Sequence, residues 1–205
     1  MSQTPPQPTG KTRPGSVSFA VWLQILLAVF FVAQTIIGFI YGPDAQAAAE
    51  AELEAQGFST ADLPEGTTFE SGGATAFVPI AFAVLLIVLA VLNAAGNRVG
   101  RILTWIVQPL VLICGGLIAF TLFFAAASLE AGLEATGEGE GLDVQALFDA
   151  VYGAYPSWTA VVDYGLVALA TLGSLLVIVL LAVPSANAYF RKEEPEKFIP
   201  GAPPA

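Results

Sequence analysis

The chain has 205 residues, of which 56% are hydrophobic and only 12% are charged. Soluble domains carry about 25% charged residues, so this chain cannot cover a globular surface with polar groups and is predicted to be a membrane protein. It contains no His, the commonest acid–base catalyst and transition-metal ligand. Its one cysteine, Cys114, lies in an apolar run and belongs to no metal-binding pattern. The net charge of −10 disfavours nucleic acid as a partner.

The chain begins with a Pro-rich stretch, residues 1–16, which cannot bury an apolar core and is expected to be a disordered tail. Four apolar segments follow, each near or above the roughly 20 residues that a helix needs to cross the hydrocarbon core. They span residues 17–41, 77–95, 102–128 and 158–183. The predicted fold class is all-α: a polytopic membrane domain over 17–183 with four transmembrane helices in an antiparallel bundle. A second Pro-rich tail, 184–205, is also expected to be disordered.

Two long acidic loops connect the segments on one side of the predicted bundle. They span residues 42–76 and 129–157. In the first loop, Asp44 is suited to cap a helix and Gly57 to end one. We therefore predict a separate short helix over 45–56, followed by irregular chain over 58–76.

The second loop has a Gly-rich acidic centre over 135–141, followed by an amphipathic stretch that begins at Asp143. The apolar stripe consists of Val144, Leu147, Phe148, Val151 and Tyr152. This spacing predicts a short helix that lies on the membrane surface or covers the end of the bundle. The acidic residues between 134 and 143 lack the spacing of a calcium loop, so a solvated loop is expected there and no metal site.

The charges are distributed asymmetrically along the chain. All seven Lys and Arg lie in the two tails or in the turn at 96–101, whereas the two long loops contain 13 acidic residues and no basic ones. The positive-inside rule then places both termini in the cytoplasm and both acidic loops outside. The predicted location is the plasma membrane, with the lipid bilayer as the first partner.

Residues 11–47 also have features of a secretory signal: a basic start, an apolar stretch, and the pattern Ala45-Gln46-Ala47. Signal peptides have an apolar region of about 7–15 residues, and the stretch here is longer. We therefore favour retention of the first segment over cleavage after Ala47.

Asp163 is the only charged residue inside the four predicted spans. Counted from the span ends, it lies at a depth similar to that of Gln34 in the first span, so the two are predicted to meet if these spans pack together. Tyr164 and Thr121 complete a candidate intramembrane polar site. The alternatives are an ion or proton site and a boundary carboxylate that contacts water or a neighbouring helix. Three further polar residues, Gln24, Asn93 and Gln108, are expected to form a second layer near the span ends that adjoin the Lys and Arg residues.

Two segments, PGSVSFAVWLQILLAV (14–29) and PSANAYFRK (184–192), resemble those of small, uncharacterised four-helix membrane proteins of actinobacteria. The resemblance implies a bacterial membrane protein, but it implies no activity and no site residues. The four-span layout is also that of claudins, but the chain lacks their paired extracellular cysteines and signature loop.

These observations predict no catalytic residues, no cofactor and no metal, and hence a protein that is not an enzyme. The leading hypothesis is a structural or accessory component of the bacterial cell envelope that interacts with a membrane protein or with further copies of itself. One alternative is an oligomeric transporter or channel subunit that uses Asp163. A second alternative is an envelope sensor, although the chain has no cytoplasmic domain that could carry its output.

Overall fold

The computed structural model describes residues 12–70, 76–137 and 141–191, and within these ranges it is helical and contains no strand. The long helices are α1 (Gly15–Ala55), α2 (Phe77–Ala94) and α3 (Arg98–Thr136), followed by the short α4 (Val144–Gly153). The last apolar stretch comprises α5 (Thr159–Ala168), a π-helical segment (Leu169–Gly173) and α6 (Ser174–Ala182), and α7 (Pro184–Phe190) follows it. Four of these helical stretches are long and apolar enough to cross a membrane, which confirms the expected all-α class with four candidate spans.

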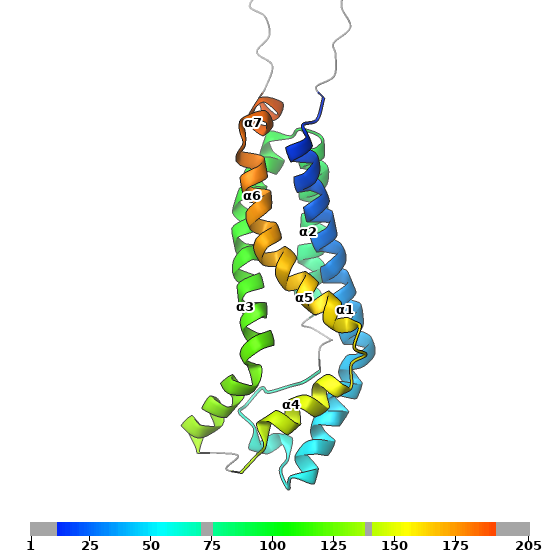
Figure 1. Ribbon diagram of the computed structural model, residues 1–205, viewed down its shortest axis with the longest axis vertical. Helices are drawn as coiled ribbons and strands as arrows, with labels where there is room; N and C mark the ends of the chain where they lie inside the picture. The colour runs from blue at the N-terminus through cyan, green and yellow to red at the C-terminus, as the bar shows by residue number, and fades with distance from the viewer. Residues whose placement is uncertain (1–11, 71–75, 138–140, 192–205) are drawn as a thin grey trace, which may run out of the picture.

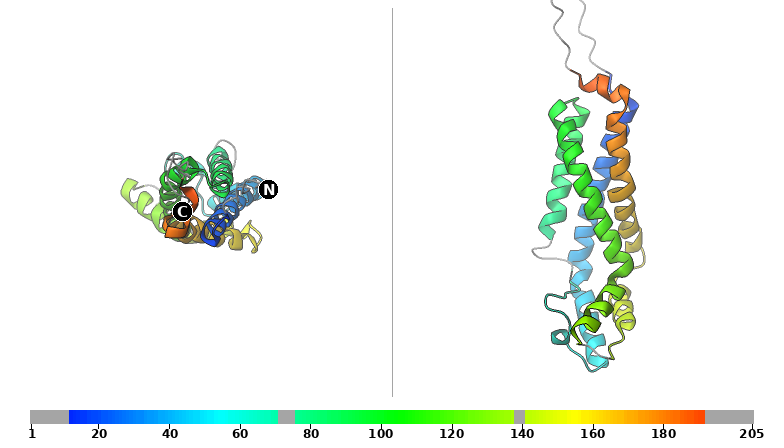
Figure 2. Two further views of the ribbon diagram at one scale, coloured as in Figure 1. Left: turned by 90° about the horizontal axis from the view of Figure 1, so that it is seen from above. Right: turned by 90° about the vertical axis from the view of Figure 1, so that its left-hand side faces the viewer.

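The four apolar stretches lie side by side along one long axis (Figure 1). α1 packs against α2 and α6, and α3 packs against the same two helices; Figure 2 shows this arrangement from above. The buried apolar core between them includes Leu27, Leu86, Val111 and Ala170. Large apolar side chains also cover the outward faces, with Trp22 66% and Leu172 66% exposed. Such faces are suited to lipid rather than water.

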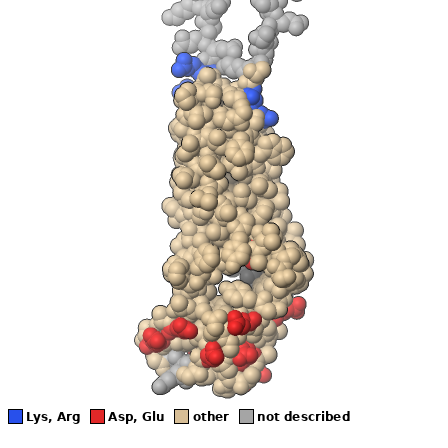
Figure 3. Space-filling view, viewed as in Figure 1, with Lys and Arg blue, Asp and Glu red and all other residues tan. Residues whose placement is uncertain are grey.

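Charge divides the molecule into two ends. In Figure 3 the Lys and Arg side chains lie at the upper end, and the Asp and Glu side chains gather at the lower end. We call these the basic end and the acidic end. The described chain begins and finishes at the basic end (Figure 1), because the four long stretches alternate in direction.

The separate helix predicted over 45–56 is wrong, because α1 continues through Pro43 to Ala55. Proline inside a helix removes one backbone hydrogen bond. The Ala-rich sequence that follows favours helix, and its buried residues Ala45, Ala49 and Leu53 pack against other segments, which compensates for that loss. Gly57, with φ of +84°, ends the helical region as expected. Cleavage after Ala47 would therefore cut a continuous helix.

The predicted tail and loop boundaries also need correction. Residues 184–190 are not a disordered tail, because Pro184 occupies the first turn of α7, where proline is well tolerated. Phe190 is buried, and its ring lies 5.3 Å from the Arg101 guanidinium. α3 extends past the predicted boundary at 128 to Thr136, and its end is marked by Gly137 in the left-handed conformation. Residues 1–11 and 192–205 lie outside the described residues.

The two acidic segments fold together into what we call the acidic head, residues 44–70, 129–137 and 141–153. α4 forms as predicted, with Asp143 accepting a capping hydrogen bond from the Ala146 amide at 2.9 Å. Its stripe packs on the last turns of α1 and α3 around a core that includes Leu53, Leu133 and Leu147. Gln56 joins the ends of α1 and α4: its side chain accepts from the Asp143 amide at 2.7 Å and donates to the Asp143 carbonyl at 3.2 Å.

The π-helical segment Leu169–Gly173 lies within the fourth apolar stretch and was not predicted. α3 approaches this π-helical segment very closely. A Cβ added at Gly115 of α3 would lie 2.6 Å from the Cβ of Ala170 in the segment and 2.9 Å from the Ala170 carbonyl carbon. Small residues such as Gly115 and Ala170 permit this close approach of two helices. π-helical turns often occur at functional sites.

Candidate functional site: a chamber near the acidic end

A large cavity lies in the half of the molecule next to the acidic head, and we call it the chamber. Its volume is about 970 Å³. Side chains from every neighbouring element line it, including Ile37 of α1, Phe82 of α2, Leu117 of α3 and Phe148 of α4. The lining is mainly apolar and aromatic. The spans thus form the sides of the chamber and the acidic head lies at one end of it, and the chamber is partly open to the molecular surface.

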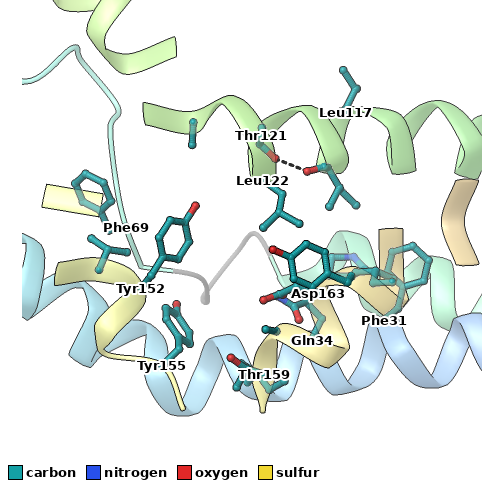
Figure 4. A pocket seen from close by; sticks show the side chains of 18 of the residues that line it. Phe31, Gln34, Phe69, Leu117, Thr121, Leu122, Tyr152, Tyr155, Thr159 and Asp163 are labelled. Carbon is teal, nitrogen blue, oxygen red and sulfur yellow. Dashed lines mark hydrogen bonds between the residues drawn. The ribbon is translucent and has the colours of Figure 1, made fainter. Parts of the chain in front are cut away.

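All four predicted site residues line this chamber: Asp163, Gln34, Tyr164 and Thr121. Asp163 and Gln34 lie beside each other in the chamber (Figure 4). The side-chain oxygen of Gln34 is buried and has no hydrogen-bond partner. The first and fourth predicted spans therefore meet at these two residues, through α1 and α5.

The other two residues line the chamber but take part in local contacts. The Thr121 hydroxyl donates to the Ile118 carbonyl of its own helix at 2.9 Å. The Tyr164 ring lies 6.2 Å from that of Phe123 and is 56% exposed. These contacts of Thr121 and Tyr164 do not involve Asp163, so the polar centre of the chamber consists of Asp163 and Gln34.

Tyr152 was assigned to the apolar stripe of α4, and its position in the chamber was not predicted. Burial raises the pKa of its phenol, and the negative charge of Asp163 raises that pKa further. Tyr152 thus brings a phenol from α4 to the lining of the chamber that also contains Asp163. A tyrosine at the edge of an apolar stripe was the signal for this role, since its ring can be buried while its hydroxyl faces a polar space.

A second polar cluster lies nearer the basic end and is fully buried. The Asn93 amide donates to the Thr104 hydroxyl at 2.8 Å and to the Gln24 side-chain oxygen at 3.1 Å. The Gln108 amide donates to the Ser174 hydroxyl at 3.0 Å. Gln24, Asn93 and Gln108 were predicted to lie at one depth, but their partners Thr104 and Ser174 were not identified.

This cluster joins the helices to one another, and its side chains are fully buried. The Thr104 hydroxyl in turn donates to the Gly100 carbonyl at 2.9 Å, so one hydroxyl connects three helices. Threonine and serine are common at such helix contacts in membranes, because a polar group without a partner is costly there. We assign the cluster a structural role.

The described residues hold no group of three or more Cys, Asp or Glu side chains that could bind a metal. Cys114 is half-buried and lines the chamber without a second thiol, since it is the only cysteine in the sequence. Asp143 caps α4, whereas Glu138 and Glu140 lie outside the described residues. The chamber offers one carboxylate, that of Asp163, next to the Gln34 amide.

No protein family, curated protein or solved structure matches this chain. The molecule is defined by its own geometry as a helical protein with four candidate spans, an acidic head and a chamber beneath that head.

Proposed function

We propose that the chain is a non-enzymatic protein of the bacterial plasma membrane, an accessory or structural component of the cell envelope. In this proposal the four spans form an antiparallel bundle across the bilayer. The basic end and both termini face the cytoplasm, and the acidic head lies outside. The support for this orientation is that Lys and Arg gather at one end of the molecule and carboxylates at the other.

The acidic head is the observation that carries the accessory role. Two segments far apart in the sequence bury a shared apolar core, which includes Ala49 and Leu147, and expose carboxylates such as Glu50 and Asp149. A loop that serves only as a connection has no need for its own core. A folded acidic surface outside the membrane is suited to bind a partner protein with a basic surface or a further copy of the chain.

The test is photocrosslinking in the native membrane. A photoreactive residue replaces Glu50 or Asp149 in the head, and the matched control replaces Val179, which is 52% exposed on the lipid-facing side of α6. We expect both head positions to give the same discrete protein adduct, identified by mass spectrometry as another membrane protein or as a second copy of the chain. An absence of protein adducts from both head positions would contradict the accessory role.

A transporter or channel subunit is the second candidate, because the chamber places Asp163, the only charge in the predicted spans, in a large internal space. Four helices seldom enclose a pathway alone, so this role requires an oligomer. The test measures proton and cation flux in liposomes containing the chain or its Asp163→Asn variant. Flux that disappears in the variant supports transport, and flux that is absent or unchanged rules it out.

A further inference from the structure

We infer that the chamber is a binding site for an amphipathic organic cation, a molecule with an elongated apolar body and an alkylammonium group. In the bound state the ammonium group lies at Asp163 and Gln34, and the body fills the apolar part of the chamber. This inference depends on the chamber alone and does not require the accessory role of the head.

The size and lining of the chamber require an occupant with an apolar body. Protein interiors contain few voids larger than a water molecule, whereas ligand pockets have volumes of about 300–1,000 Å³. The chamber, at about 970 Å³, is at the upper end of that range. Along α3 the lining runs from Val111 to Ala125, about 21 Å at the rise of an α-helix, so an elongated molecule fits best.

The polar groups of the chamber select a cation. Asp163 is the one charged side chain among the described residues that line it, and no Lys or Arg accompanies it there. The unpartnered side-chain oxygen of Gln34 is a second acceptor at the same place. The rings of Tyr152 and Tyr164 also line the chamber, and aromatic faces stabilise ammonium groups.

The surroundings of the chamber also favour a positively charged ligand. α3 and α5 diverge toward α4 in Figure 1, and Figure 3 shows a hollow in the surface at this level, next to the acidic end. The Arg side chains that the structure describes all belong to the basic end: Arg13, Arg98, Arg101 and Arg191. Carboxylates near an opening raise the local concentration of cations and repel anions. Phosphate-bearing lipids are therefore poorer occupants than a simple ammonium amphiphile.

The test uses two fluorescent probes that share one apolar body, trimethylammonium-diphenylhexatriene and neutral diphenylhexatriene, so that they differ by the cationic group alone. The full chain is reconstituted in nanodiscs of zwitterionic lipid, and energy transfer from its tryptophans to the probe is compared with that in empty nanodiscs. We expect saturable transfer to the cationic probe at one probe per chain. Asp163→Asn should weaken this binding about ten-fold or more, because it removes the charge partner of the ammonium group.

Two control variants separate the site from other effects. Asp149→Asn removes the same charge from the exposed surface of the head, outside the chamber, and should leave the binding unchanged. Ala160→Phe places a ring in the chamber and should abolish saturable binding of the cationic probe, with folding checked by circular dichroism and gel filtration.

Three outcomes would overturn the inference. Equal weakening by Asp149→Asn and Asp163→Asn would assign the binding to surface charge. Saturable binding of the neutral probe with equal affinity would show an apolar site without charge selection. A co-purifying phospholipid that the cationic probe does not displace, detected by mass spectrometry, would show that a lipid is the natural occupant.

Discussion

At the scale of single residues, small side chains and buried hydroxyls decide how closely the spans approach. Gly115 permits α3 to contact Ala170 directly, and Thr104 receives hydrogen bonds from two neighbouring helices. Helices in a membrane gain little from the hydrophobic effect between themselves, so close packing and interhelical hydrogen bonds carry more of their association.

Gly115→Ala should destabilise the protein by about 1–3 kcal/mol, because the new methyl group would overlap the side chain and backbone of Ala170. The neighbouring Gly116 is the matched control: nothing lies within 4 Å of a Cβ added there, and Ala favours helix over Gly by about 1 kcal/mol. Thermal unfolding in detergent measures both variants. A Gly115→Ala protein as stable as Gly116→Ala would contradict the close contact.

Thr104→Val keeps the shape of the side chain but removes the acceptor of the Asn93 and Gln24 amides. We expect a loss of about 1–2 kcal/mol, since two buried donors lose a partner. Thr121→Val is the control, because that exposed hydroxyl bonds only to its own helix and its removal should change stability by less than about 0.5 kcal/mol. Denaturant titration in mixed micelles checks the difference between the two variants.

At the scale of elements, the sequence predicted what depends on local pattern. The four apolar segments and the stripe of α4 were identified from length and periodicity. Two features that depend on tertiary packing were not. α1 passes through Pro43 because its continuation is buried in the acidic head, and α7 forms because Phe190 is buried at the basic end. The capping residue Asp44 indicated a separate helix, and the proline content of 184–205 indicated a tail.

Leu147→Ala should loosen the acidic head and leave the spans intact. Leu147 is fully buried in the core of the head, so its truncation should cost that core about 2–5 kcal/mol. We expect faster hydrogen exchange in residues 45–55 and 144–153 and unchanged exchange in α2. Gln145→Ala, on the exposed side of α4, is the control and should leave all three regions unchanged. Faster exchange spread evenly over the spans would contradict an independent core.

At the scale of the whole molecule, part of the chamber could be predicted and part could not. Depth counting placed Asp163 near Gln34, because it needs only the helix rise and the span ends. The volume of the chamber and the contribution of Tyr152 depend on how α4 and α5 are placed relative to α3, which no local pattern specifies. The π-helical segment was also missed, since it depends on contacts of the fourth stretch with its neighbours.

The proposed orientation predicts a clear labelling pattern in intact cells. In a Cys114→Ala background, Asp149→Cys should react with a membrane-impermeant maleimide, because the acidic head lies outside. Arg98→Cys should react only after the cells are permeabilised. Both positions are exposed, so access depends on the side of the membrane. The reverse pattern would place the head in the cytoplasm and refute the orientation.

The continuity of α1 has a mechanical consequence. Its 41 residues form one rod of about 62 Å that belongs both to the head and to the basic end. A force or tilt applied to the head is therefore transmitted toward the far end along one helix, and Pro43 is the position where this helix can bend. A partner that binds the head can thus shift the position of the first residues of α1, and with them the α7 segment that packs alongside.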